Sequence, residues 1–251
     1  MNTIRIQKAA ALLVHARRSM VPLHGLPDDL KPISIDEGHA MQDAVSRSLG
    51  KLIGGFKAMS PPGQQPNRGI IYADTIFPSP CDAPAAKVPQ CGVEGEVAFV
   101  FRQNLPSRAV AYSRNEVAAV VDAFAAIEIV HSRYSIEGPL SNLEKLADSI
   151  MNGGLVCGAP NTDWRGLDLG NIKVGMTVNG KPMDKKLPGH PLGDPLGVAV
   201  VLANLWREKG GVRAGQVVTC GSYTGLDYLK PGDTCTVTFE GLGSATVTFA
   251  V

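Results

Sequence analysis

The sequence lacks the features that mark several classes of protein. Its 251 residues contain no apolar stretch approaching the roughly 20 residues that cross a bilayer. The N-terminal apolar run is short and is followed by basic residues, not by a small-residue cleavage site. Net charge is only +1 and no basic block occurs. We therefore expect a protein without a signal peptide, a membrane span or a nucleic-acid partner.

Paired cysteines are also missing. The five cysteines are odd in number and none forms a C-x-x-C pair. This pattern indicates free or buried thiols in a reducing compartment and argues against a disulfide framework. We expect a cytoplasmic location.

Turn residues, in contrast, are plentiful, with 28 glycines and 18 prolines. They favour a strand-rich, looped fold over a helical bundle. Helical signals come first in the chain: residues 4–20 have helical composition, and a Ser34-x-x-Glu37 cap precedes a helix that would stop at Gly50. We expect an α+β protein with a helical region at 1–53 and a β-rich catalytic domain at 54–251, which together form a single structural unit.

Strand and turn signals fill the second part. Residues 93–101 indicate a strand, and a Ser113–Glu116 capping box opens a helix that changes to a strand within AAIEIVH. Residues Asn179-Gly180 predict a hairpin turn, and Asp194 followed by Pro195 predicts the start of a helix. The stretch from IIYADTIF to Gln90 suggests a short strand or turn followed by irregular structure.

The segment CGVEGEVAFVF carries the most informative chemistry. In a strand, Glu94 and Glu96 project from the same face, where their charges repel. The pair either lies on a solvated edge strand or binds a hard cation through oxygen ligands. A third carboxylate, Glu128, lies in the apolar strand AAIEIV, where it either forms a salt bridge to Arg133 or a lysine, or joins the same metal site.

The segments GVEGEVAFVF, AIEIVHSRY, GSYTG and KPGDTCTVTFEGLGSATVTF, in this order, resemble the 2-keto-4-pentenoate hydratase family of the fumarylacetoacetate hydrolase superfamily. The resemblance runs from about Gly54 to the end of the chain. It implies a mixed, rolled β-sheet core and a Mg²⁺ or Mn²⁺ ion bound by Glu94, Glu96 and Glu128.

The resemblance also assigns roles to single residues. Lys57 in GGFK and Asp74 in IIYADTIF match family positions for acid/base or substrate-orienting groups, while Ser222 and Thr224 in GSYTG match a pocket that holds the substrate carboxylate. A solvated lysine and ordinary turn residues are the alternatives. Asp148 and His190 also match family positions, and helix capping and loop shape explain them as well.

Two departures from the family pattern concern the pocket. The loop after Lys57 reads AMSPPGQQPN, and His131 stands where an acidic residue is usual. His131 is either a packed structural histidine or a base near the metal.

The activity implied by the resemblance is metal-dependent addition of water to a 2-hydroxy-2,4-dienoate, giving a 4-hydroxy-2-keto acid in the breakdown of aromatic compounds. The resemblance further implies a homo-oligomer, a dimer or larger. Decarboxylation of a 4-oxalocrotonate-type acid and fumarylacetoacetate-type carbon–carbon hydrolysis are the alternative reactions. A binding protein on an enzyme fold is the non-enzymatic alternative.

Overall fold

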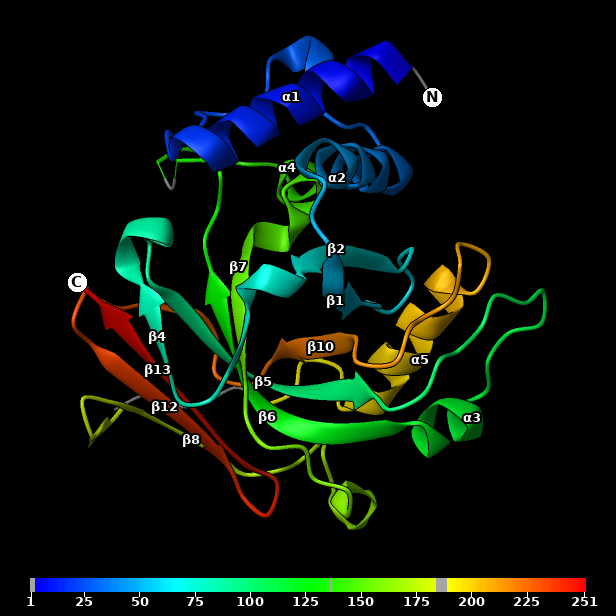
Figure 1. Ribbon diagram of the computed structural model, residues 1–251, viewed down its shortest axis with the longest axis vertical. Helices are drawn as coiled ribbons and strands as arrows, with labels where there is room; N and C mark the ends of the chain where they lie inside the picture. Colours follow the sequence, from blue (N-terminus) through cyan, green and yellow to red (C-terminus); the bar gives the residue numbers. More distant parts are fainter. Residues whose placement is uncertain (1–2, 136, 184–188) are drawn as a thin grey trace.

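The computed structural model describes residues 3–135, 137–183 and 189–251 of the chain. Figure 1 shows its helices and strands. The helices are α1 (Thr3–Ser19), α2 (Ile35–Leu49), α3 (Arg114–Ala119), α4 (Asn142–Ala147) and α5 (Pro195–Trp206), with 3₁₀ turns η1 (Asp28–Leu30), η2 (Ala73–Thr75), η3 (Ala85–Lys87), η4 (Ser149–Met151) and η5 (Trp164–Gly166). The strands are β1 (Ile53–Met59), β2 (Asn67–Tyr72), β3 (Ile76–Pro78), β4 (Cys81–Pro84), β5 (Gly92–Phe101), β6 (Val121–Val130), β7 (Asn152–Cys157), β8 (Val174–Val178), β9 (Lys181–Pro182), β10 (Val217–Ser222), β11 (Asp227–Tyr228), β12 (Thr234–Phe239) and β13 (Gly243–Ala250).

The larger sheet curls upon itself. Its strand order is β2-β1-β10-β5-β6-β7-β3, with β11 added beside β5. The two ends of this order are consecutive in the chain, because β2 passes through η2 directly into β3. Strand β2 also contacts β7 across the interior. Gly69 of β2 also lies close to η4, the turn before β7, since a Cβ at that position would lie 2.5 Å from the carbonyl oxygen of Ser149. We call this curled sheet the roll.

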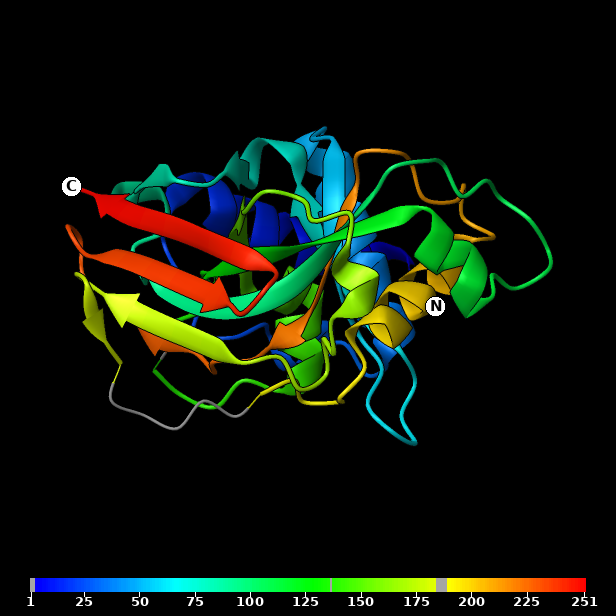
Figure 2. The same cartoon turned by 90° about the horizontal axis from the view of Figure 1, so that it is seen from below.

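The roll has an interior face and an outer face. Its interior holds a small apolar cluster formed by Ile71, Ala98, Phe124, Ala126, Leu155 and Val217. Its outer face packs against α5 and against the smaller sheet, whose order is β4-β13-β12-β8-β9. Figure 2 shows β13, β12 and β8 of this smaller sheet side by side. The main core therefore lies between the two sheets, and the interior of the roll holds buried polar groups beside its small apolar cluster.

The N-terminal helices pack together at one end of the molecule (Figure 1). Helices α1 and α2 share an apolar cluster that also takes in Tyr134 and Ala147. Gln42 of α2 attaches the helices to the roll: its amide nitrogen donates to the carbonyl of Arg68 at 2.8 Å, and its amide oxygen accepts from the Ile70 amide at 3.1 Å. No helix in the described part of the chain is both long and apolar enough to span a membrane.

Local sequence signals are confirmed where a cap or a turn determines the structure. Ser113 and Glu116 form a reciprocal capping box, Asp194 caps α5, and Asn179-Gly180 turns with positive φ at both residues. Strand β6 begins earlier than the sequence indicates, at Val121. Every residue of β6 is buried on one face or the other, so the strand lacks the apolar–polar alternation that identifies half-buried strands. The stretch 78–90, expected to be irregular, contains the end of β3 and the whole of β4.

Candidate active site

The carboxylate cluster consists of Glu94, Glu96 and Glu128 inside the roll. Glu94 and Glu96 lie on β5 and Glu128 lies directly opposite Glu94 on β6. One oxygen of each carboxylate lies within 4.8 Å of the others. Strand β5 is hydrogen-bonded to β10 on one side and β6 on the other, so it is no edge strand, and Glu96 is only 1% exposed. Alternation along the strands thus brings three acidic side chains together where water is largely excluded.

Lys57 of β1 reaches this cluster from across the roll. Its Nζ lies 2.6 Å from Oε2 of Glu128 and donates to the carbonyl oxygen of Ile150 at 3.1 Å. Burial by itself would lower the pKa of Lys57, but the nearby carboxylates, Glu128 foremost, raise that pKa above its ordinary value. Glu128 therefore forms a salt bridge, the alternative that the sequence left open, and its partner is Lys57. Arg133, the other candidate partner, binds Asp148.

Electrostatic crowding persists in spite of Lys57. Burial is the largest cause and repulsion from Glu128 the next, and together they raise the pKa of Glu96 to about 8. The Gly221 amide donates a hydrogen bond to Glu96 at 2.9 Å, which acts in the opposite direction and lowers the pKa. Lys57 offsets one negative charge, and below about pH 8 the metal-free cluster relieves another by keeping Glu96 protonated. The carboxylates repel one another, and a bound cation would relieve this repulsion. A hard divalent cation fits the site because it prefers carboxylate oxygens as ligands. The residues present therefore fit a Mg²⁺- or Mn²⁺-type ion.

Two groups that sequence reasoning missed orient the cluster. Asn152, at the start of β7, donates its amide to Oε1 of Glu128 at 2.8 Å. The Ile150 carbonyl that accepts from Lys57 belongs to a turn in which Ser149, Ile150 and Met151 have φ values of 55°, 54° and 59°. Three successive non-glycine residues in this region are rare, and each costs about 1–2 kcal/mol. Neither group has a spacing or composition that a sequence pattern could reveal.

Ser222 and Thr224 lie beside the cluster but make different contacts. Ser222 is paired with Glu96 in the strand register, and its hydroxyl accepts from the Gly225 amide at 2.9 Å. That hydroxyl keeps its proton available for a ligand. The Thr224 hydroxyl accepts from the Gly95 amide at 2.8 Å and donates to the Gly225 carbonyl at 3.0 Å. Thr224 therefore fixes the backbone of β5 between Glu94 and Glu96.

The structure does not bring Asp74 to the cluster. Its carboxylate is 57% exposed, lies 2.7 Å from Nζ of Lys51, and lines a cavity outside the roll. His131 lines the same outer cavity. His190 has backbone partners, with Nε2 2.8 Å from the Cys220 carbonyl and Nδ1 accepting from the Leu192 amide, so it shapes its loop.

The chain is similar to known proteins in both sequence and fold. Residues 57–250 match the family model described as fumarylacetoacetate (FAA) hydrolase C-terminal. The chain therefore belongs to the fumarylacetoacetate hydrolase family.

Individual relatives are similar over nearly their whole length. The chain is 28% identical to a 2-keto-4-pentenoate hydratase of Paraburkholderia xenovorans (strain LB400), covering 97% of this chain and 94% of the relative. It is also 28% identical to a 2-hydroxyhexa-2,4-dienoate hydratase of Comamonas testosteroni, covering 97% of both. A 4-oxalocrotonate decarboxylase from Pseudomonas putida G7, solved with magnesium and adipate, shares the fold at a TM-score of 0.83 and 22% identity, covering 99% of this chain and 98% of that one.

Proposed function

We propose that this protein is a hydro-lyase that adds water to a 2-hydroxy-2,4-dienoate and releases a 4-hydroxy-2-keto acid in the breakdown of aromatic compounds. The observation that carries the proposal is the convergence of three carboxylates, two buried and Glu94 half-buried, with the Lys57 ammonium inside the roll. The hydratase names of the relatives support it. The Lys57 ammonium adds a proton-transfer group to what would otherwise be only a metal-binding site.

Metal binding falls to Glu94, Glu96 and Glu128. A divalent cation, Mg²⁺ or Mn²⁺, would supply Lewis-acid polarisation of the substrate's 2-oxygen and carboxylate. Asn152 holds Glu128 in one orientation through its 2.8 Å hydrogen bond. The Gly221 amide does the same for Glu96 at 2.9 Å. These donors fix the carboxylates before any ligand arrives, so that little reorganisation accompanies binding.

Proton handling falls to Lys57. Hydration requires the dienol proton to leave the 2-oxygen, a proton to reach the far carbon of the diene, and water to add across the remaining C3–C4 double bond. Nζ of Lys57 is held between Glu128 and the Ile150 carbonyl, which aims it into the interior of the roll. The Ser222 hydroxyl donates to the substrate carboxylate in this arrangement. The acid/base role that the family resemblance implies for Asp74 has no support in the geometry, because its carboxylate pairs with Lys51 outside the roll, and substitution tests it.

The setting of the reaction belongs to the same proposal. A small 2-keto acid as substrate, a cytoplasmic location and a homo-oligomer of two or more chains are all in keeping with the family resemblance. The five cysteines are free thiols, as a reducing compartment would maintain them.

The test is product analysis with purified protein. We expect 2-hydroxypenta-2,4-dienoate to disappear in the presence of Mg²⁺ or Mn²⁺ and to gain one water, and we expect EDTA to stop the reaction. The variant Glu96→Gln should be inactive, while Glu240→Gln, which alters an exposed carboxylate, should keep the parent rate. Release of CO₂ from 4-oxalocrotonate without hydration of the dienoate would replace the hydratase by a decarboxylase. Turnover of neither substrate, with a metal bound, would favour a hydrolase or a binding protein.

A further inference from the structure

A second cavity lies outside the roll, beside the end of α1. It has a volume of about 590 Å³ and is bounded by α1, by the Tyr72–Thr75 turn and by the outer faces of β3 and β6. Ile129 and His131 line this cavity. Glu128, the neighbour of Ile129 in β6, points the other way, into the roll, where it binds Lys57. Because side chains alternate along a strand, the sheet itself separates this cavity from the carboxylate cluster. We call it the α1 cavity.

The charge of the α1 cavity is strongly positive. Its lining includes five cationic side chains, namely Arg17, Arg18, Lys51, Lys87 and Arg133, and one carboxylate, Asp74, which pairs with Lys51. The excess of cations on one concave surface favours an anionic ligand.

Two of these guanidinium groups share a single buried carboxylate. Arg133 places Nε 2.5 Å from Oδ1 of Asp148, and Arg17 places Nη2 3.4 Å from the same oxygen. Asp148 is fully occupied by this arrangement, since its other oxygen accepts from the Ser132 hydroxyl and the Arg133 amide. One positive charge is therefore left over beside the cavity, where burial makes an uncompensated charge expensive.

Unsatisfied polar atoms mark the same place. Nε of Arg17 and Nδ1 of His131 are buried and have no hydrogen-bond partner within the described ranges of the chain. Burial and the neighbouring Arg133 lower the pKa of Arg17 to about 10, and the same causes lower the pKa of His131 to about 4. An anion in the cavity would supply both the missing acceptor and the missing negative charge.

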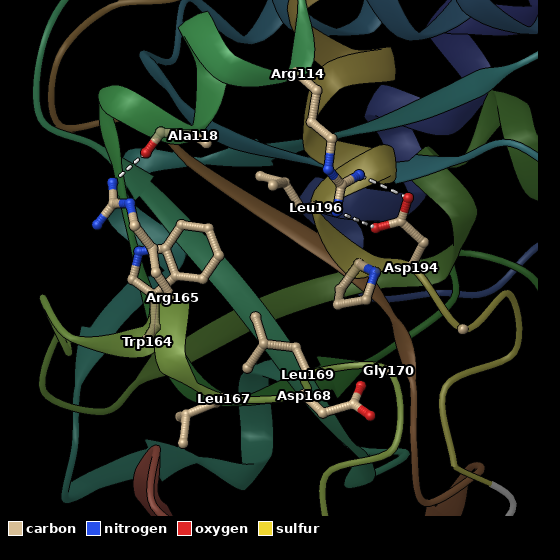
Figure 3. Close-up of a pocket in the computed structure, with 12 residues that line it drawn as sticks. Arg114, Ala118, Trp164, Arg165, Leu167, Asp168, Leu169, Gly170, Asp194 and Leu196 are labelled. Carbon is tan, nitrogen blue, oxygen red and sulfur yellow. Dashed lines mark hydrogen bonds and ion pairs between the residues drawn. The ribbon is translucent and has the colours of Figure 1, made fainter.

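Another cavity of the molecule shows the contrast. It measures about 340 Å³ and also contains arginines (Figure 3). There Arg114 binds both oxygens of Asp194, at 2.7 and 3.0 Å, and Arg165 donates to the Ala118 carbonyl. The cations of that cavity are thus already engaged by the protein, as the dashed lines of Figure 3 show. The left-over charge belongs to the α1 cavity.

We propose that the α1 cavity binds a small organic carboxylate with an apolar body. The cationic side chains, led by Arg17, hold the carboxylate, and the apolar walls formed by Leu49, Phe77 and Ile129 pack against the body. The site is distinct from the carboxylate cluster and needs no metal.

Benzoate is the probe and benzyl alcohol its neutral counterpart, each titrated into the full-length protein in EDTA. Calorimetry measures affinity, and the ¹³C-methyl resonance of Ile129 reports where the ligand sits. We expect benzoate to bind and to shift the Ile129 resonance, and benzyl alcohol to bind at least about tenfold more weakly, because it lacks the charge-assisted hydrogen bond.

Variants on α1 provide matched controls. Arg17→Gln should weaken benzoate binding by about tenfold or more, whereas Lys8→Gln, an exposed change on the same helix, should leave it within twofold. Arg17→Lys keeps the charge and serves if Arg17→Gln fails to fold; it should retain part of the affinity and the preference for benzoate over the alcohol. Equal binding of benzoate and benzyl alcohol, an unmoved Ile129 resonance, or binding that requires Mg²⁺ would each overturn the proposal. Because every measurement is made without metal or turnover, failure of the hydratase proposal would leave this result unaffected.

Discussion

Replacing Lys57 by methionine should affect stability and metal affinity in opposite directions. Lys57→Met keeps the length of the side chain but removes the ammonium that lies 2.6 Å from Oε2 of Glu128. Glu128 is completely buried and would retain only its hydrogen bond from Asn152. The variant therefore leaves a buried carboxylate without its cation, inside a cluster that is already crowded with negative charge.

The magnitude follows from the burial of both partners. The Lys57 side chain is 10% exposed and that of Glu128 is 0% exposed, so solvent screens their interaction little. Removing one partner of a buried ion pair typically costs about 3–5 kcal/mol. The matched control is Lys51→Met, whose ion pair with Asp74 is 41% and 57% exposed and should contribute only about 0–1 kcal/mol.

Metal affinity should rise in the same variant. In the parent protein Lys57 competes with a divalent cation for Glu128, so its removal frees a ligand and adds unrelieved negative charge. We expect Mn²⁺ to bind Lys57→Met at least as tightly as the parent and to restore most of its lost stability. Turnover should nevertheless fall by about 10²–10⁴, because the proton-transfer group is gone.

Urea unfolding in EDTA, repeated with saturating Mn²⁺, measures the stability changes, and calorimetry measures the metal affinity. If Lys57→Met loses no more stability in EDTA than Lys51→Met does, the Lys57–Glu128 ion pair does not stabilise the fold as expected. Weaker metal binding in Lys57→Met would equally contradict it, and parent turnover would make Lys57 a structural residue.

The remaining predictions concern pH, Asn152 and Asp74. Since the pKa of Glu96 is raised from 4.5 to about 8, the folded metal-free protein holds a proton that the unfolded chain releases, so stability should fall as pH rises from 5 to 8. Glu96→Gln should reduce this slope in urea titrations at several pH values, and an unchanged slope would exclude Glu96 as its source. Asn152→Ala should weaken Mn²⁺ binding by about 10–100-fold, measured by calorimetry, because it frees Glu128 to rotate; parent affinity would show that Asn152 does not orient Glu128. Asp74→Asn should change kcat by less than about tenfold, since Asp74 lies outside the roll; a hundredfold loss would return it to the acid/base role.

The sequence predicts those parts of the site that depend on strand periodicity. Glu94 and Glu96 had to share a face because they are two residues apart in a strand, and the cost of burying them pointed to a cation. Their meeting with Glu128 follows from the pairing of β5 with β6, which the sequence does not specify. Lys57 was found only through the family resemblance, because β1 reaches the cluster by the curling of the whole sheet.

Other features have no local signal. Asn152 and the Ile150 carbonyl act through orientation, which depends on a left-handed turn that ordinary residues seldom adopt. Arg17 likewise looks in the sequence like any other basic residue of α1. It differs from the exposed ones because it is half-buried, pairs with Asp148 and lies near the charge of Arg133. The sequence places the start of β6 too far along the chain, because burial on both faces removes the alternation of apolar and polar residues that identifies a strand.

The central claim is that Glu94, Glu96 and Glu128 hold a divalent cation within the roll. Anomalous diffraction from crystals grown with Mn²⁺ tests it most directly. We predict one strong peak between the three carboxylates, with an oxygen of each at roughly 2.0–2.6 Å from the metal and Nζ of Lys57 withdrawn from Glu128. A cluster that stays metal-free at saturating Mn²⁺, with Lys57 still bound to Glu128, would contradict it.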